Sequence, residues 1–590
     1  SFLTSITGRF LYQFGITAAV AVLLSLVVSF TLTPAMCARL VKPARGGASA
    51  HAGGGRWSER RYAGALRWSL RWPWLVVLVS AVVVASTVVV AGKVRQDFIP
   101  SDVDEGEFEI NVNGPDDASL AAMDGVMRAV EAELAQVRAV RVALTQVGGG
   151  FLSGLSNGSV YVRIAPHDKR RFSLARLWQA TLAGDPAAAF RGNYTQREVM
   201  AEIRQRLRKL TDVRISVRNQ RSFNLGGGPF PLDFAIRGPD LPTLATAVEQ
   251  LRVTASKVGS MIDLDTTLRL RRPELRVQID RPRAAELGVS TTDIATALRL
   301  MVGGVTEVSR FRDPRLDEEY DVRLRVREAD RQRVERIGEL LVGRGDGGTV
   351  RLDNLVRIEP ATTSSRIDRM DRQRQASLRG SPAPGAALAD AVADLRRLAG
   401  ELQLPTEYST AVAGSARELE QAGGEFVGAF LLAIAFMYMI LAAQFESFTQ
   451  PLIILLAIPV AAPFALLSLW ATGETLNLYS ALGILVLFGM VKKNAILQVD
   501  HTNQLLAAGL PAADAVVQGS RDRLRPILMT TLAFVAGMLP LAVGAGPGAE
   551  ERKAIAIVVI GGQSMCLVLS LLLTPVVQWL GLRRKASARD

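Results

Sequence analysis

Seven long apolar runs constrain what this chain can fold into more than any other feature of its sequence. Each run holds about 20 residues, and a helix of that length crosses the roughly 30 Å hydrocarbon core of a bilayer at about 1.5 Å per residue. The sequence therefore predicts a polytopic α-helical membrane protein with seven transmembrane helices, near residues 14–32, 74–94, 426–443, 451–470, 476–499, 526–543 and 554–580.

Two lysines lie inside the fifth of these runs. Lys492 and Lys493 follow Gly489-Met-Val and precede Asn494-Ala-Ile-Leu, so they are not at a polar exit from the run. A lysine at the centre of a spanning helix costs about 2.5–3.5 kcal/mol on insertion scales, and such residues commonly mark ion or proton pathways. The alternative is that a long side chain extends to the membrane surface. Because two neighbouring residues cannot share one side of a helix, Lys493 is the better candidate for a pathway and Lys492 for the surface.

Basic residues cluster in three places between and after the apolar runs. Eight Lys and Arg residues and a single acid, Glu59, lie between Met36 and Pro73, and further clusters occupy residues 501–525 and 583–585. Cytoplasmic loops of membrane proteins carry such an excess of positive charge. The sequence therefore predicts that all three clusters are cytoplasmic and that the insert over residues 95–424 is extracytoplasmic. Much of the net charge of +13 is thereby explained without a nucleic-acid partner.

The insert alternates the signals of short strands and helices. Residues 107–113 alternate apolar and polar side chains as a half-buried strand does, and Thr195-x-x-Glu198 is a capping box that opens a helix. The pattern predicts small α+β units of ferredoxin-like type, joined by glycine-rich loops at 226–228 and 345–348. The expected strands lie near 107–113, 140–147, 159–164, 213–217, 232–236, 274–279, 320–326 and 349–352, and the expected helices near 118–136, 195–210, 244–257, 291–302 and 386–402.

The two ends of the chain share a short motif. Val27-x-Ser29-x-x-Leu32-Thr33-Pro34 recurs as Val568-x-Ser570-x-x-Leu573-Thr574-Pro575. A duplicated transporter would show such an echo. Residue 1 is not methionine, and we expect the chain to start within a longer protein. The two cysteines, Cys37 and Cys566, form no disulfide or metal-binding pattern.

A set of motifs in one order gives the sequence its resemblance to a known family. The chain resembles the resistance–nodulation–division (RND) efflux transporters, in particular the hydrophobe/amphiphile multidrug branch linked to antibiotic resistance. The motifs are Thr7-Gly8-Arg9, Tyr12-Gln13-Phe14, Leu32-Thr33-Pro34-Ala35-Met36-Cys37-Ala38, Asp97-Phe98-Ile99-Pro100, Glu446-Ser447-Phe448-Thr449-Gln450-Pro451, Lys493-Asn494-Ala495-Ile496-Leu497 and Arg523-Leu524-Arg525-Pro526-Ile527-Leu528-Met529-Thr530.

The resemblance implies an architecture, namely seven of the family's twelve transmembrane helices with a large periplasmic insert. The implied parts are a sixth helix over 1–36, a cytoplasmic basic loop over 37–72, a seventh helix over 73–95, porter sub-domains over 96–229, a docking sub-domain over 230–345, a second porter part over 346–424, the eighth to twelfth helices over 425–582 and a cytoplasmic tail over 583–590. The docking assignment depends most on the match over residues 280–290.

The same resemblance implies a proton relay. Lys493 matches the family lysine that pairs with two aspartates on the fourth helix, Thr530 matches a relay threonine, and Arg523 matches a basic residue at the cytoplasmic mouth. A lysine beside carboxylates keeps them charged, and protonation of the carboxylates releases the pair. The two aspartates are expected upstream of Ser1. No acid stands inside a spanning run here, so this chain alone is not expected to move protons.

Substrate contacts are also implied for the insert. The segment that begins with Gly148, Gly149, Gly150 and Phe151 resembles the family's glycine-rich switch loop, and Tyr161 matches an aromatic residue of the deep drug pocket. Glycines let a loop change backbone state at little cost, and an aromatic ring suits apolar ligands. The alternative is a hairpin loop followed by an aromatic side chain in the core of the sheet.

The resulting prediction is a secondary transporter, not an enzyme. It would export hydrophobic or amphiphilic compounds in exchange for protons, with no cofactor beyond the proton as coupling ion, from the bacterial inner membrane. The implied partners are two further copies in a homotrimer, a periplasmic adaptor (membrane fusion protein) and an outer-membrane channel. The alternatives are a heavy-metal exporter, for which Met123, Met127 and Met200 would be candidate ligands, a lipid-exporting or secretion-accessory member, and a split or truncated pump that does not transport alone.

Overall fold

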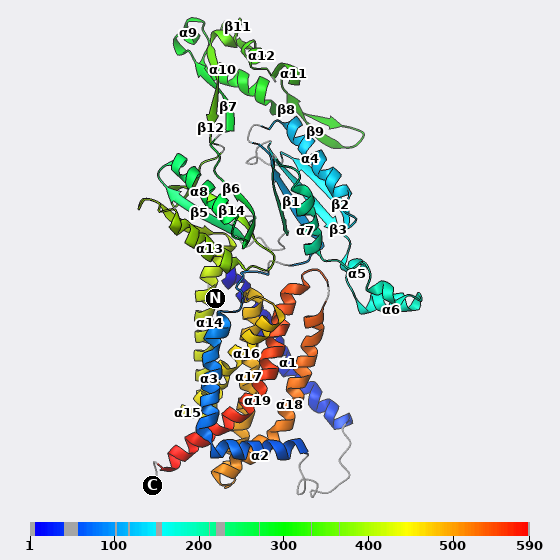
Figure 1. The fold of residues 1–590 in the computed structure, drawn as a ribbon, viewed down its shortest axis with the longest axis vertical. Coiled ribbons are helices and arrows are strands. Elements are labelled where there is room, and N and C mark those ends of the chain that lie inside the picture. Colours follow the sequence, from blue (N-terminus) through cyan, green and yellow to red (C-terminus); the bar gives the residue numbers. More distant parts are fainter. Residues whose placement is uncertain are drawn as a thin grey trace. The chain divides into compact units, whose positions relative to one another are not determined.

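The computed structural model, drawn in Figure 1, forms two compact units. One combines Ser1–Thr267 with Arg369–Asp590, and the other is Leu268–Asp368. The structure describes residues 6–40, 57–100, 103–115, 118–148, 156–211, 213–219, 230–270, 272–331, 333–364, 366–544 and 546–587.

All seven apolar runs are helical. Among the described residues, seven helical segments are long and apolar enough to cross a membrane. The fourth run is divided after Leu455 into two successive helices. The helices are α1 (Ile6–Leu40), α3 (Pro73–Ala91), α14 (Ser415–Phe445), α15 (Thr449–Leu455), α16 (Ala457–Thr472), α17 (Leu478–Ala507), α18 (Ala512–Val543) and α19 (Ala549–Ser587).

Helix α19 packs against α16, α17 and α18. Glycines permit the closest approaches: a Cβ atom on Gly561 would lie 2.2 Å from the Cβ of Ser468, and one on Gly562 would lie 2.3 Å from a methyl of Leu487. Buried Leu487, Val491 and other aliphatic side chains fill the space between these helices. Small residues therefore set the spacing of the bundle, as is usual for helices that pack in a membrane.

The predicted basic loop over residues 37–72 is only partly a loop. Helix α1 continues to Leu40, and a separate helix, α2 (Trp57–Arg71), precedes α3. Alanine and leucine at positions 63, 66 and 70 lie on one side of α2 and are buried against α18 and α19. The hydroxyl of Tyr62 donates a hydrogen bond to the carbonyl of Leu571, 2.8 Å away. The basic residues are present as predicted, and the apolar residues of α2 recur every three or four positions, as in an amphipathic helix.

The first sheet follows the predicted strands closely. Its strands are antiparallel in the order β2-β3-β1-β4, and two helices cover one face. This β-α-β-β-α-β order is the ferredoxin-like arrangement. Phe108, Ile110 and Ile203 lie in the core between sheet and helices. The elements are β1 (Glu107–Asn113), α4 (Leu120–Ala135), β2 (Val140–Val147), β3 (Asn157–Ile164), α7 (Gln196–Leu207), which the predicted capping box of Thr195 opens, and β4 (Arg214–Asn219).

The second sheet joins two distant stretches of chain. Strand β14 pairs with β5 on one side and β6 on the other, and β15 pairs with β5. Its core includes Phe234, Leu378 and Leu395. The elements are β5 (Leu232–Gly238), α8 (Leu241–Ala255), β6 (Met261–Thr266), β13 (Asp368–Met370), β14 (Gln373–Pro382), α13 (Leu388–Glu401) and β15 (Ser409–Ala413).

The separate unit Leu268–Asp368 lies between β6 and β14 in the sequence. Its bounds differ from the predicted sub-domain over 230–345, because residues 232–266 belong to the second sheet and the glycines at 345–348 form the turn of a hairpin inside the unit. Its elements are β7 (Arg272–Ile279), α9 (Arg281–Glu286), α10 (Thr291–Leu298), η2 (Arg299–Gly303), β8 (Val305–Asp313), β9 (Glu318–Leu324), α11 (Glu328–Arg331), α12 (Val334–Gly338), β10 (Leu341–Gly343), β11 (Thr349–Arg351), η3 (Leu352–Asn354) and β12 (Val356–Thr363).

Candidate functional site

A cavity of about 760 Å³ lies within the larger unit, where both sheets approach the ends of α18 and α19. Its walls combine apolar side chains with a few charged ones. Phe98, Phe172, Met200, Ile262 and Val543 supply apolar surface, and Glu105, Arg171, Glu550 and Lys553 are among the charged residues that line it. Such a mixture, mainly apolar with a few polar groups, is typical of sites for small organic ligands.

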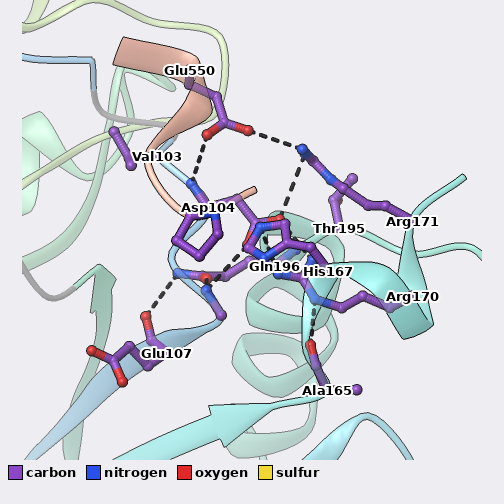
Figure 2. A network of polar contacts seen from close by, with 12 residues as sticks. Val103, Asp104, Glu107, Ala165, His167, Arg170, Arg171, Thr195, Gln196 and Glu550 are labelled. Carbon is purple, nitrogen blue, oxygen red and sulfur yellow. Dashed lines mark hydrogen bonds and ion pairs between the residues drawn. The ribbon is translucent and has the colours of Figure 1, made fainter. Parts of the chain in front are cut away.

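A buried ion pair, drawn in Figure 2, contains Asp104, which lines this cavity. Arg170 donates from Nη1 to Oδ2 of Asp104 over 2.7 Å and from Nη2 to Oδ1. The side chains of Arg170 and Asp104 are 0% and 4% exposed, so the pair is screened from water. His167 places Nε2 3.1 Å from Oδ1 of the same carboxylate. Bidentate geometry and burial make this a strong contact, provided that both partners are present.

Local structure explains why Asp104 is held there. It precedes Gly106, whose backbone has a φ of +81° and turns the chain into β1. Helix α5 (His167–Arg170) follows β3 and carries both His167 and Arg170. The side-chain amide of Gln196, at the start of α7, accepts from the Gly106 amide over 2.7 Å and donates to the Glu107 carbonyl over 2.9 Å. The backbone amide of Gln196 also donates to Oδ2 of Asp104 over 3.3 Å, so the loop before β1, α5 and the start of α7 meet at one carboxylate.

Arg171 and Glu550 extend this network to the helices. Nη1 of Arg171 donates to Oε1 of Glu550 over 3.1 Å, and the other carboxylate oxygen of Glu550 accepts from the Asp104 amide over 3.3 Å. Glu550 lies in the first turn of α19, where a negative charge interacts favourably with the helix dipole. The network thus connects the start of a long apolar helix with the first sheet.

The network shifts the pKa values of its members. Burial alone would raise the pKa of Asp104, but the hydrogen bonds and the charge of Arg170 outweigh burial and hold it below the ordinary value of 3.8. Burial lowers the pKa of His167 below 6.5, with help from the charges of Arg170 and Arg171. At neutral pH the network therefore contains an ionised Asp104 and a neutral His167.

The predicted relay residues lie on α17 and α18. Lys493 is exposed and Lys492 is half-buried, whereas Asn494 and Gln498 face the interior of the bundle. Thr530 is exposed, and its hydroxyl donates to the carbonyl of Ile527 over 3.1 Å. In the part of the chain that the structure describes, no hydrogen bond or ion pair joins Lys493, Thr530 and Arg523 to one another. The relay assignment stays a prediction.

The predicted substrate residues are divided between described and undescribed segments. Gly149, Gly150 and Phe151 lie outside the described residues, and Gly148 follows β2 with a φ of +65°. Tyr161 lies on β3 and faces away from the core of the first sheet, because the buried residues of β3 alternate with it. Its hydroxyl donates to Glu107, and this hydrogen bond raises the pKa of the Tyr161 phenol. The alternative of a core aromatic is therefore wrong for Tyr161.

Comparison with known proteins identifies the family. The model of the AcrB/AcrD/AcrF family matches residues 1–580. The chain belongs to the AcrB/AcrD/AcrF family. Members of this RND family are efflux transporters of the inner membrane, so the predicted superfamily is confirmed.

Two solved structures of a heavy metal efflux pump share the fold of this AcrB/AcrD/AcrF family member. Crystal form II matches with a TM-score of 0.73 at 23% sequence identity, over 89% of this chain and 51% of the other. Crystal form I matches with a TM-score of 0.70 at 23% identity, over 89% and 52%. The chain thus spans about half the length of the structures that it matches.

The network around Asp104 was missed by sequence reasoning. Its members come from a loop, from α5 and from α19, and no local pattern marks residues that meet only in the folded AcrB/AcrD/AcrF chain. One signal was available in the motif Asp97-Phe98-Ile99-Pro100. Asp97 is buried, and its Oδ1 accepts from the Leu388 amide over 2.7 Å at the start of α13. The motif thus contains a buried carboxylate that joins the segment after α3 to the start of α13.

Proposed function

We propose that this chain forms part of an inner-membrane permease that exports hydrophobic or amphiphilic compounds from the periplasm in exchange for inward-moving protons. The single observation that carries the proposal is the cavity between the two sheets and the outer ends of α18 and α19. Its volume of about 760 Å³ is within the roughly 300–1,000 Å³ range of pockets for drug-sized molecules.

The composition of the cavity favours amphiphiles. Phe98, Phe172 and Val543 offer apolar contact, and Arg171 and Glu550 supply charges of both signs that can orient a polar head group. The second surface in this proposal is the face of the first sheet on which Tyr161 lies beside Glu107.

Proton coupling is assigned to α17 and α18. Lys493 is the charge that would pair with carboxylates when they are ionised, and Thr530 and Arg523 would pass the proton along α18. Helices α17 and α18 pack on α19, whose first turn carries Glu550 and with it the contact to Arg171. A shift of these helices on protonation would therefore reach the cavity wall, which Glu550 joins through Arg171 and the Asp104 amide. The complete pump is proposed to be a trimer that works with a periplasmic adaptor and an outer-membrane channel.

A heavy-metal cargo is the second candidate, since the solved structures that match are of a heavy metal efflux pump. The burial of two of the three candidate methionines favours organic cargo. Met123 and Met127 are fully buried between α4 and the first sheet, and Met200 packs in the same core but also lines the cavity. Within the described ranges no three His, Cys, Asp or Glu side chains gather as a metal site. A methionine thioether could bind a transported metal ion only where it is exposed to the transport path.

Accumulation of a fluorescent amphiphilic dye tests the proposal in cells that express the complete pump. Ser381→Trp places a bulky ring in the cavity and should raise dye accumulation, and Gln250→Trp on the exposed side of α8 is the matched control. Resistance to copper and zinc salts is measured in parallel. If the cavity variant impairs metal resistance and leaves dye export unchanged, the cargo is metal and the amphiphile proposal is wrong.

A further inference from the structure

Helix α2 presents two different faces. Ala63, Leu66 and Leu70 on one face are buried, and the helix packs on α18 and α19. The opposite face carries Trp57 and Trp68, which are 65% and 54% exposed. Large exposed aromatic side chains that lie together usually mark an interaction surface. Because the buried face already has its partner within the chain, the aromatic face is the one that is available to another molecule.

The contacts of α2 with α19 indicate its depth in a membrane. Figure 1 shows α2 running across the long helices, at their end away from the two sheets. The hydroxyl of Tyr62 donates to the Leu571 carbonyl, and the part of α19 from Ala549 to Leu571 is about 33 Å long at about 1.5 Å per residue. That length is close to the roughly 30 Å of a bilayer's hydrocarbon core. In a bilayer that α19 crosses, Tyr62 and its helix would therefore lie at the inner boundary, beside the lipid head groups.

The exposed face of α2 is strongly basic. Its exposed basic residues are Arg60, Arg61, Arg67 and Arg71. Glu59 is the single acid of the helix, and in the segments that the structure describes no ion pair joins any of the four arginines to a carboxylate. The guanidinium group of Arg61 lies over the ring of Trp57, 3.8 Å from its centroid. Anionic groups outside the chain are therefore the partners that this face can attract.

Gly64 lies at the centre of this basic face. Residues three and four positions apart are neighbours on a helix surface, so Gly64 is surrounded by Arg60, Arg61, Arg67 and Trp68. Glycine inside a helix is less favourable than alanine, yet a Cβ atom on Gly64 would meet nothing within 4 Å. Packing within the protein therefore does not require glycine here. The missing side chain instead leaves the backbone uncovered between three arginines, where a small anionic group can approach closely.

We propose that Arg60, Arg61 and Arg67 bind the head group of an anionic phospholipid over Gly64. Guanidinium groups bind phosphate through paired N–H donors, and arginines beside the inner leaflet attract its negatively charged lipids. The exposed tryptophans hold the helix among the head groups, because the indole ring is apolar and its N–H is polar. A zwitterionic lipid binds less tightly, since its ammonium group is repelled by the arginines. The bound lipid stabilises the packing of α2 on α18 and α19, because the site exists only in the folded chain.

Native mass spectrometry of the purified full chain tests this site, because it gives dissociation constants for phosphatidylglycerol and phosphatidylcholine added to the detergent solution. Phosphatidylglycerol should bind about tenfold or more tightly than phosphatidylcholine. Arg61→Gln or Arg67→Gln should each weaken phosphatidylglycerol binding about fivefold, which corresponds to about 1 kcal/mol per arginine. Arg583→Gln is the matched control and should leave the affinity unchanged, because Arg583 is also exposed and lies over a tryptophan, Trp579, 5.5 Å from its ring centroid.

Gly64→Leu keeps every charge and covers the backbone at the centre of the site. It should weaken phosphatidylglycerol binding as strongly as the loss of one arginine, whereas Gly125→Leu, at an exposed and equally open position of α4, should not. Circular dichroism checks that helix content is unchanged in each variant. Equal binding of the two lipids, or native affinity in Gly64→Leu, overturns the proposal. Tighter binding of an RNA oligonucleotide than of phosphatidylglycerol, lost in the variants of Arg61 and Arg67, would assign the face to nucleic acid instead.

Discussion

Arg171 and Glu550 are 379 positions apart in the sequence, yet the guanidinium Nη1 of one lies 3.1 Å from the carboxylate Oε1 of the other. The two side chains are 28% and 21% exposed, so water screens the pair in part, and its stabilising effect is expected to be about 1 kcal/mol or less. The pair is of interest because it connects the first turn of α19 to the part of the protein that lines the cavity.

Exchange of these two charges should show whether the Arg171–Glu550 contact couples α19 to the cavity. Arg171→Glu or Glu550→Arg alone puts like charges together and should lower dye efflux by the complete pump several-fold, while the double variant recovers part of it. Arg128→Glu, at an exposed helical pair with Asp124, is the control and should leave efflux unchanged. If the double variant is no better than either single one, the contact does not couple the two parts.

Removal of one charge from the buried pair should destabilise the protein. Asp104→Asn leaves the Arg170 guanidinium buried without its counter-ion, and breaking such pairs costs about 3–5 kcal/mol. Thermal unfolding of the purified chain in detergent measures the loss, and Asp124→Asn at the protein surface is the control. An unfolding temperature equal to that of the native chain would mean that the pair is open to water in solution.

Acid should weaken the same network in two steps. The folded-state pKa of His167 is below 6.5, so the unfolded chain binds more protons and stability falls as pH drops below about 6.5. The pKa of Asp104 is also lowered, so its contribution is present above about 3.8 and is lost as pH falls through the folded value. His167→Gln should flatten the upper step when unfolding temperature is measured from pH 7.5 to 5. An unchanged slope would exclude His167 as its source.

Lys493→Ala tests the relay in the complete pump. Loss of the positive charge should abolish proton-coupled dye efflux at unchanged expression, because the carboxylates of the relay would lose their counter-ion. Lys492→Ala is the matched control on the neighbouring side of α17 and should retain most activity. Efflux at the native level in the Lys493 variant would refute the relay assignment, and a reversed pattern would transfer it to the half-buried Lys492.

Substrate choice should respond to Tyr161 rather than to its neighbours in the core. Tyr161→Ala removes a ring from the open face of the first sheet and should change the relative export of different dyes at constant stability. Phe108→Ala, in the core of the same sheet, should cost about 3–5 kcal/mol and lower export of all dyes together. Phe151→Ala is expected to resemble the Tyr161 variant. A uniform loss across dyes would place either aromatic residue in a folding role.

Local patterns in the sequence predicted local structure well. Alternation gave β1 over residues 107–113 and β2 over 140–147, and the capping box at Thr195 gave the start of α7. Both signals depend on neighbours a few residues apart. Helix α6 (Leu174–Leu182) and the strands β6 and β15 were not predicted, although two of these elements carry local signals. Helix α6 has three leucines at helical spacing after the Ser173 cap, and β6 alternates apolar and polar residues over 262–265.

The same local patterns could not predict which strands and side chains pair when they are distant in the sequence. The glycines at 345–348, predicted to be a loop or a sub-domain joint, form the turn between β10 and β11, and the unit Leu268–Asp368 is set off by the pairing of β5 with β14. Glycine shows where a chain turns but not which strands meet after the turn. The same limit hid the contact between Asp104 and Arg170, whose partners are known only from the fold.

Helix α2 sets a condition on the biogenesis of the protein. Its buried face, with Leu66 at the centre, is covered by α18 and α19, and Tyr62 bonds to a carbonyl of α19 that is 509 positions later in the chain. During synthesis α2 leaves the ribosome long before these partners exist. Its leucines must therefore be sheltered by lipid or by another protein until α18 and α19 have been synthesised, so α2 reaches its final packing only after Leu571 has left the ribosome.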